Sequence, residues 1–318
     1  MKKIWNKRIG VIAALVLVAV SPLILQRPEA VSRSESDEVL VVITPHNETI
    51  RNEFSVAFNT YWQKKTGKKV YLDWRAPGGT SEIRLVLDSK FANAKGGGVG
   101  IDVFFGGGDY IFEEMAKAGR FEKLEVFSSQ EGWFKGELAI PQSFTGEVYY
   151  SKAKYWVGVC LSQFGICYNV DNLKRLNVDP PKSWDDLSDP KYFGAIAMAD
   201  PTKSGSVARA FEMLVQQNIH RSLANTRRQP GETEEMRSQR AIGYGWADGL
   251  NLIQKIAANA RYFTDAATKI PHDVSQGDAA AGMCIDFYGR AYNEKLKRAD
   301  GSSRLQWVAP EGGTSLSV

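Results

Sequence analysis

The sequence predicts an α/β protein of two lobes. Its 318 residues exceed what one hydrophobic core usually serves. From residue 39 onward, short apolar runs alternate with stretches of helical periodicity, a pattern typical of a parallel sheet covered by helices. A second block with the same alternation begins near residue 157. We therefore expect one lobe at 38–156, a second at 157–290 and a return toward the first at 291–318.

The first thirty residues are typical of an export signal. Basic residues at the start precede an uncharged apolar run over 9–25. Small residues at Ala30 and Ser32 suit cleavage after Ser32, so 1–32 is expected to be a signal peptide. An N-terminal membrane anchor is the alternative, because about 17–18 apolar residues just span a bilayer. Either interpretation places the rest of the chain in the periplasm.

The net charge argues against a nucleic-acid partner, and the cysteine content argues against a disulfide framework. The formal net charge is +4, and the expected signal supplies all of it with five basic residues and one acid. The remainder sums to zero, so a nucleic-acid partner is not expected. The cysteines are too few for a disulfide framework and lack metal-ligand spacing, so they are expected to be small buried residues that form at most one bridge: Cys160, Cys167 and Cys284.

The first block is predicted to alternate strands and helices. The expected strands cover 39–44, 70–74 and 101–105. Asn47 suits the cap of a helix that runs to about residue 65, and Gly67 ends it. A second helix starts near Ser81, and Asp109 suits the cap of a third. Each strand thus ends in a turn at a helix start, where ligands bind in open α/β sheets and where free N–H groups attract anions.

The second block opens with two apolar runs, 157–161 and 164–168, which we expect to be strands that cross between the lobes. Further helices are expected at 169–176, 207–217 and 250–260, and further strands at 194–199, 279–287 and 307–308. The charged stretch 226–240 is expected to be a solvated loop or the exposed start of a helix. Trp246 is expected to pack inside the lobe.

The turn Asp200–Ser206 carries the strongest local signal. There a strand runs into hydroxyl residues and a glycine, and a helix begins directly afterwards. Hydroxyls and free N–H groups at a helix start suit a phosphate, phosphonate, sulfate or carboxylate. Plain helix capping is the alternative. The turn is not a Walker loop, because Gly-Lys-Ser/Thr is absent.

Three segments resemble the periplasmic binding proteins of ABC importers: His46–Glu48, Asp200–Ser206, and Gly277–Gly282 followed by Asp286-Phe-Tyr288. The chain is similar to the branch that carries ferric iron, phosphonates, sugar phosphates, thiamine and polyamines. The likeness spans about residues 38–318 and rests on the order and spacing of these segments. It implies a type II periplasmic-binding-protein fold, with two α/β lobes, crossover strands as the hinge and the ligand in the cleft.

The resemblance also implies a site for a small anionic or zwitterionic solute. Ser204, Gly205 and Ser206 are expected to hold the anionic head and Arg290 to supply a countercharge, while Asp286 or Glu48 receives an amine. The full expected set is His46, Asn47, Glu48, Thr80, Ser81, Gly108, Asp109, Ser162, Thr202, Ser204, Gly205, Ser206, Asp286, Tyr288 and Arg290.

Ferric iron is the alternative ligand. Ferric-binding members of the family use a His, a Glu and two adjacent tyrosines, and by position His46, Glu82 and Tyr288 match three of these four. Phe287 stands where the other tyrosine is expected, and phenylalanine has no oxygen to donate to a hard cation. If iron binds, His46, Glu82 and Tyr288 are its expected ligands.

The resulting prediction is the substrate-binding component of an ABC importer, a monomer without a cofactor that closes about its hinge and delivers its ligand to a membrane permease. An enzyme is disfavoured because none of the common hydrolase, metalloprotease or dinucleotide motifs is present. A ligand-sensing receptor anchored by its N-terminus is the other alternative. Similar chains continue beyond the strand near residue 307 with further helices, so we expect the chain to be a C-terminally truncated fragment.

Overall fold

The structure is a computed structural model that describes residues 30–94, 96, 98–144, 146–314 and 316–317. Residues 1–29, which hold most of the expected signal, lie outside the described part. Contacts divide the chain into two compact units, Met1–Val42 with Asn47–Trp74, and Ile43–His46 with Arg75–Val318. Every helix within the described ranges is too short or too polar to cross a bilayer.

The first unit contains a helix whose two ends the sequence predicts. Its elements are η1 (Arg33–Glu35), α2 (Glu48–Thr66) and all but the last residue of β1 (Glu38–Ile43) and β2 (Val70–Arg75). Asn47 caps α2, because its side-chain oxygen accepts a hydrogen bond from the Ile50 N–H at 3.1 Å. Gly67 ends α2 at a φ of 80°, and its N–H donates to the Gln63 carbonyl at 2.8 Å. Both expected helix ends are confirmed.

The second unit begins with short elements around an apolar core. These are α3 (Thr80–Ala92), β3 (Val103–Phe104), α4 (Asp109–Lys117), α5 (Val126–Ser129), η2 (Glu131–Trp133), β4 (Ser143–Phe144) and β5 (Glu147–Val148). Strands β2, β1 and β3 form one sheet in that order, and β4 pairs with β5. Ile43, Ile83, Leu87, Ile111 and Met115 are buried together, so they fix the starts of α3 and α4 against the end of β1.

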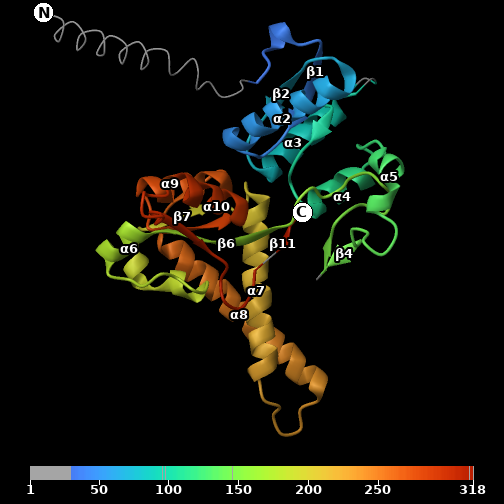
Figure 1. Cartoon of the computed structure of the whole chain (residues 1–318). Helices are drawn as coiled ribbons and strands as arrows, with labels where there is room; N and C mark the ends of the chain where they lie inside the picture. Colours follow the sequence, from blue (N-terminus) through green and yellow to red (C-terminus); the bar gives the residue numbers. More distant parts are fainter. Residues whose placement is uncertain (1–29, 95, 97, 145, 315, 318) are drawn as a thin grey trace, which may run out of the picture. The chain divides into compact units, whose positions relative to one another are not determined.

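The rest of the second unit contains a larger sheet and the helices around it (Figure 1). Its strands are, in order, β10 (Leu305–Val308), β6 (Ser162–Asn169), β9 (Ala281–Ile285), β7 (Ile196–Ala199) and β8 (Ala260–Thr264), and β11 (Leu316–Ser317) also pairs with β6. The associated helices are α6 (Val170–Leu176), η3 (Asp185–Ser188), η4 (Pro190–Tyr192), η5 (Ala267–Lys269), α9 (Ile270–Gln276) and α10 (Asp286–Lys295). Strand β6 runs antiparallel to β9, whereas β7 runs parallel to β8 and β9. The central strands β6, β9 and β7 are buried on both faces, which explains their largely apolar sequences.

Two long helices, α7 (Gly205–Asn225) and α8 (Glu234–Ala258), lie side by side as a hairpin (Figure 1). The two helices pack closely where α8 has glycine. A Cβ on Gly249 would lie 2.7 Å from the Val215 Cα, and one on Gly245 would lie 2.6 Å from the Ile219 nitrogen, so neither position has room for a side chain. Helix α8 starts much earlier than the predicted 250–260. Glycines have poor helix propensity and hid this helix in the sequence, but here they permit the packing that stabilises it.

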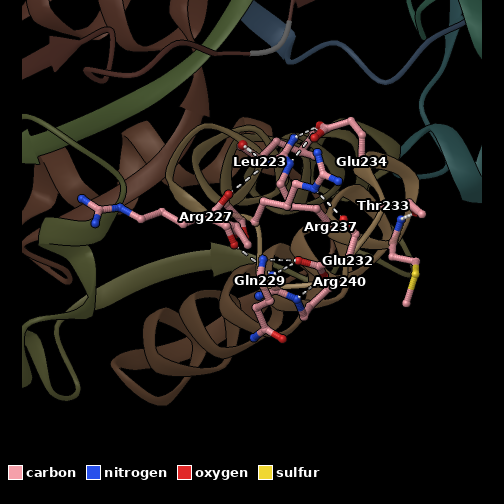
Figure 2. Close-up of polar contacts among 12 residues, drawn as sticks. Leu223, Arg227, Gln229, Glu232, Thr233, Glu234, Arg237 and Arg240 are labelled. Atoms are coloured by element: carbon pink, nitrogen blue, oxygen red, sulfur yellow. Dashed lines mark hydrogen bonds and ion pairs between the residues drawn. The ribbon is translucent and has the colours of Figure 1, made fainter.

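Arginines hold the loop that joins the two helices, residues 226–233 (Figure 2). Arg240 donates two hydrogen bonds to the Glu232 carboxylate, at 2.9 and 2.8 Å, and Arg237 donates to the Leu223 and Thr226 carbonyls. The hydrogen bond from Arg240 lowers the pKa of Glu232 to about 2. The charged stretch 226–240 is therefore part ordered loop and part helix, not a solvated chain throughout.

One strand prediction is wrong, and another is wrong only at its end. Residues 157–161 form no strand beyond a single bridge from Val157 to Tyr150, and Val159 and Leu161 are exposed, so the run is not covered by other layers. The predicted strand 279–287 ends at Ile285, and α10 begins at Asp286. Asp286, Tyr288 and Arg290 consequently lie on a helix.

Three side chains lie in environments other than those predicted. Trp246 is exposed on α8, because the packed face of that helix is formed by other residues. Cys167 and Cys284 are buried as expected, but Cys160 is exposed. All three cysteines are free thiols. Asp109 is the first residue of α4 and Gly108 precedes it, so Asp109 is not the cap.

Candidate anion site at three helix starts

The starts of α3 and α7 lie against each other. Thr80 is the first residue of α3, and Gly205 is the first residue of α7. A Cβ on Gly205 would lie 2.8 Å from the Thr80 Oγ1, so any larger residue here would displace the Thr80 hydroxyl or the helix start. In the described part of the chain, no side chain caps either helix start. The first N–H groups of both helices, and the positive ends of both helix dipoles, therefore face one small region.

A third helix start lies at the same place. The loop before α4 is Gly106–Gly108, whose φ angles of 80°, 152° and 86° suit glycine. A Cβ on Gly107 would lie 3.0 Å from the Thr80 Cγ2, so this loop passes directly beside Thr80. Gly108 precedes α4 and brings no capping side chain. Three helix starts thus meet around one threonine, and we call this region the anion cradle.

The Asp200–Ser206 turn contributes two of its hydroxyls to the cradle. Ser204 is only 3% exposed, and its Oγ lies 3.2 Å from the Ser206 Oγ. Thr202 is instead exposed, and its hydroxyl donates to the Asp200 Oδ1 at 2.6 Å. That hydrogen bond is the main cause of the lowered pKa of Asp200. The sequence left two interpretations of this turn open, a structural one and an anion site. Thr202 has a structural role because it stabilises the turn, whereas the Ser204 and Ser206 hydroxyls lie at the helix start, where an anion could bind.

An aromatic cluster surrounds His46, which follows β1. Its Nδ1 lies 2.8 Å from the Tyr288 hydroxyl, and its ring centroid lies 5.0 Å from that of Phe105 and 5.9 Å from that of Phe287. Burial lowers the pKa of His46 from 6.5 to about 4, so the imidazole is neutral at neutral pH. A neutral ring both donates and accepts a hydrogen bond, and the Tyr288 hydroxyl can complement either role.

The aromatic cluster and the anion cradle are continuous. A Cβ on Gly106 would lie 2.9 Å from the His46 Cδ2, while the neighbouring Gly107 lies beside Thr80. The glycine loop thus connects the two regions within two residues. One part offers N–H groups and hydroxyls, and the other offers aromatic faces and a neutral imidazole. This combination suits a small ligand with an anionic head and an organic body.

The charged residues near the site are paired with one another. Arg209, one turn into α7, lies 3.6 Å from the Asp109 Oδ1. Arg290 lies 3.9 Å from the Asp286 Oδ2, and its guanidinium lies over the Trp307 ring at 4.8 Å. Asp286 also accepts a hydrogen bond from the Phe287 N–H at 2.8 Å. Arg290 and Asp286 therefore pair with each other before either meets a ligand.

The remaining expected residues lie as follows. Ser81 is the second residue of α3, and Ser162 is buried at the start of β6. Asn47 and Glu48 belong to the first unit, where Asn47 caps α2. The Glu82 carboxyl group lies against Gly78. Within the described residues, no three His, Cys, Asp or Glu side chains gather as a metal site.

Sequence reasoning missed the glycines and one arginine. Gly79, Gly106 and Gly107 form walls of the site, and their signal was visible in the glycine-rich turns that end two predicted strands. Arg209 carries no motif, so only the fold brings it to Asp109.

Acidification tests the environment of His46. Between about pH 6.5 and 4 the unfolded chain binds a proton at this residue that the folded chain does not, so stability should fall as the pH falls through this window. Above pH 6.5 the contribution should be constant. We expect the melting temperature of His46→Gln to fall less over this window than that of the wild type, measured by circular dichroism. Parallel pH profiles would contradict the assignment.

Residues 100–318 match the family of bacterial extracellular solute-binding proteins, and the chain belongs to that family. The family is a class of binding proteins, and membership indicates a location outside the cytoplasm.

Individual relatives are distant. An uncharacterised protein of Haemophilus influenzae is 24% identical over 242 residues, covering 75% of this chain and 58% of that protein. The phosphoglycerate transport regulatory protein PgtC of Salmonella typhimurium is 25% identical over 132 residues, covering 42% of this chain and 27% of its own length. The chain therefore spans between a quarter and three fifths of the length of these relatives.

The fold comparison includes the periplasmic binding protein AfuA of Actinobacillus pleuropneumoniae, solved with fructose-6-phosphate bound. It aligns with a TM-score of 0.63 at 17% identity, over 89% of this chain and 72% of that protein. The predicted two-lobed type II periplasmic-binding-protein fold is confirmed.

Proposed function

We propose that this protein is the extracytoplasmic substrate-binding component of an ABC importer. It captures a small anionic solute in the periplasm and delivers it to a permease in the inner membrane. The observation that carries the proposal is the meeting of the starts of α3, α4 and α7 around Thr80. Three helix dipoles and their free N–H groups favour a negatively charged group at this point.

The ligand class that fits best is a phosphate monoester. The Thr80, Ser204 and Ser206 hydroxyls can donate to phosphate oxygens alongside the helix N–H groups. His46, Phe105 and Phe287 offer aromatic contacts and one polar nitrogen to the organic part. The names of two similar proteins, one for phosphoglycerate transport and one with bound fructose-6-phosphate, support this class.

The mechanism is hinge closure. The lobe at 38–156 supplies the starts of α3 and α4, and the lobe at 157–290 supplies the start of α7 and Tyr288. A ligand that contacts both sets favours the closed form by the difference between its contacts in the closed and open forms. The Arg209–Asp109 ion pair and the His46–Tyr288 hydrogen bond join the same two stretches of chain, so they add to closure.

A ligand-sensing receptor is a second candidate, because the Salmonella relative is named a regulatory protein. Such a receptor would capture the same ligand at the same cradle and report it to a membrane signalling partner. Ferric iron remains the alternative cargo, since His46 and Tyr288 meet at 2.8 Å. Iron fits less well, because Phe287 lacks a donor atom and each of those two groups already bonds the other.

Replacing both Ser204 and Ser206 with alanine should weaken binding of fructose-6-phosphate or 3-phosphoglycerate about tenfold or more. The loss of even one hydrogen bond to a charged group costs about 1.5–3 kcal/mol, and every 1.4 kcal/mol is a factor of ten in affinity. Isothermal titration calorimetry measures the change, and Thr202→Ala is the matched control because that hydroxyl bonds Asp200. Titration of the wild type with free phosphate tests the anionic group alone, fructose tests the organic part alone, and ferric citrate tests iron as the alternative cargo. Equal affinity of the double variant and the wild type would rule out the cradle as the anion site.

A further inference from the structure

Arg209 brings a permanent positive charge to the edge of the anion cradle. It lies four residues after Gly205 on α7, and residues four apart share one face of a helix. Long side chains on a helix lean back toward its N-terminus, so the Arg209 side chain extends over the first turn of α7. Its contact with the Asp109 Oδ1 at 3.6 Å agrees, because Asp109 is the first residue of α4. The guanidinium group therefore lies between the starts of two helices that form the cradle.

The guanidinium group of Arg209 keeps donors available for a ligand. Its Nη1 donates to the Glu212 carboxylate at 3.1 Å, whereas its Nη2 lies 3.6 Å from Asp109, beyond the length of an ordinary hydrogen bond. Arginine carries five N–H donors in a planar fork, and the hydrogen bond to Glu212 uses one of them. The Arg209 side chain is 51% exposed, so a ligand that enters the cradle can reach the others.

The acidic surroundings of Arg209 make its charge important for an anionic ligand. Glu212 and Asp109 contact the guanidinium group, and Glu147 interacts with it electrostatically. Without the arginine these carboxylates would repel an anion in the cradle, and a dianion would be repelled twice as strongly as a monoanion. Each helix dipole supplies only about half a unit charge in compensation. A doubly charged ligand is therefore the one that depends most on Arg209.

We propose that Arg209 binds the anionic head of the ligand and makes the cradle selective for a dianion. The inference rests on the proposed function, because it adds one more group to the same site. Glu212 and Asp109 hold the guanidinium group in position before the ligand binds. A phosphate monoester is a dianion above its second pKa of about 6, so it can accept from several N–H groups of the fork at once. A sulfate monoester has nearly the same shape but carries a single charge.

Arg209→Gln tests the proposal when fructose-6-phosphate and fructose 6-sulfate are compared at pH 8. One unit charge about 4 Å from another in water is worth about a factor of five in affinity. The variant should therefore bind the sulfate ester about fivefold more weakly and the phosphate ester about 25-fold more weakly, since the dianion loses the contribution twice. Isothermal titration calorimetry at one ionic strength measures both, because salt screens exposed charges. A purely structural role of Arg209 would weaken the two esters equally.

Two further variants serve as controls. Arg221→Gln removes an arginine of the same helix that pairs with Asp185 at 2.8 Å and lies about 18 Å along the axis from Arg209, so binding of both esters should be unchanged. Glu212→Gln removes a carboxylate that competes for Arg209, so the phosphate ester should bind about two- to fivefold more tightly. Circular dichroism verifies that each variant is folded.

The outcomes separate this inference from the proposed function. If the wild type binds the phosphate ester but Arg209→Gln weakens both esters equally, or neither, the role of Arg209 is overturned and the proposed function stands. Weaker binding of the phosphate ester by Glu212→Gln also contradicts the role of Arg209. A wild type that binds neither ester overturns both.

Discussion

We expect Gly205→Ala to weaken the binding of a phosphate monoester strongly. The new Cβ would lie 2.8 Å from the Thr80 Oγ1, closer than a carbon and an oxygen normally approach, so either the Thr80 hydroxyl must rotate out of its place in the cradle or the starts of α3 and α7 must move apart. In either case the proposed anion loses part of its joint contact with the starts of α3 and α7. Because several charged hydrogen bonds are lost together, each of about 1.5–3 kcal/mol, we expect a loss of roughly 100-fold or more, measured by calorimetry.

Two further variants give this prediction its controls. Gly132→Ala places a methyl group where nothing in the described chain lies within 4 Å, at a residue without a positive φ, so binding should be unchanged. Adding Thr80→Ala to Gly205→Ala removes the clashing oxygen and leaves the Thr80 Cβ at an ordinary 3.4 Å. Affinity should then recover in part. If Gly205→Ala alone binds like the wild type, the two helix starts do not act together.

The largest effect on stability is expected at Gly245. A Cβ there would lie 2.6 Å from the Ile219 backbone nitrogen, and a backbone atom cannot rotate away as a side chain can. Gly245→Ala should therefore force α7 and α8 apart and destabilise the protein by about 1–3 kcal/mol or more. The midpoint of urea unfolding, followed by circular dichroism, should move to a lower concentration.

The same substitution two residues earlier should act in the opposite direction. Gly243 lies on the exposed side of α8, and nothing among the described atoms would meet its Cβ. Gly243→Ala should stabilise the helix by up to about 1 kcal/mol through helix propensity alone. Both variants replace one hydrogen with a methyl group. If the free energy of unfolding falls in Gly245→Ala and rises in Gly243→Ala, the difference reports the packing of α7 on α8. Equal shifts in both variants would show that the close contact at Gly245 does not contribute.

Local sequence was sufficient where a residue acts on its own neighbours. Asn47 and Gly67 were expected to begin and end α2, and they do, because capping needs only the next three or four residues. The buried strands of the second lobe were also recognisable, since a strand covered on both faces is apolar along its whole length. Residues 157–161 show the limit of this reasoning: they have the same composition but remain uncovered.

The anion cradle was predicted in part. Ser204, Gly205 and Thr80 were named because hydroxyl and glycine residues follow the strands at helix starts. Their mutual contact could not be predicted, because Thr80 and Gly205 are separated by more than a hundred residues. Arg209 and Gly106 were missed for the same reason, since each matters through a partner that is remote in sequence.

The sequence by itself determined the class of fold, the ends of individual helices and the kinds of chemical group available to a ligand, because periodicity, capping and composition act over a few neighbouring residues. Only the tertiary structure decided which helix starts meet, that the half-buried His46 lies against Tyr288, and that α8 is long with exposed apolar side chains. These features depend on packing between distant segments. Packing also overrides local propensity, as the glycines of α8 demonstrate.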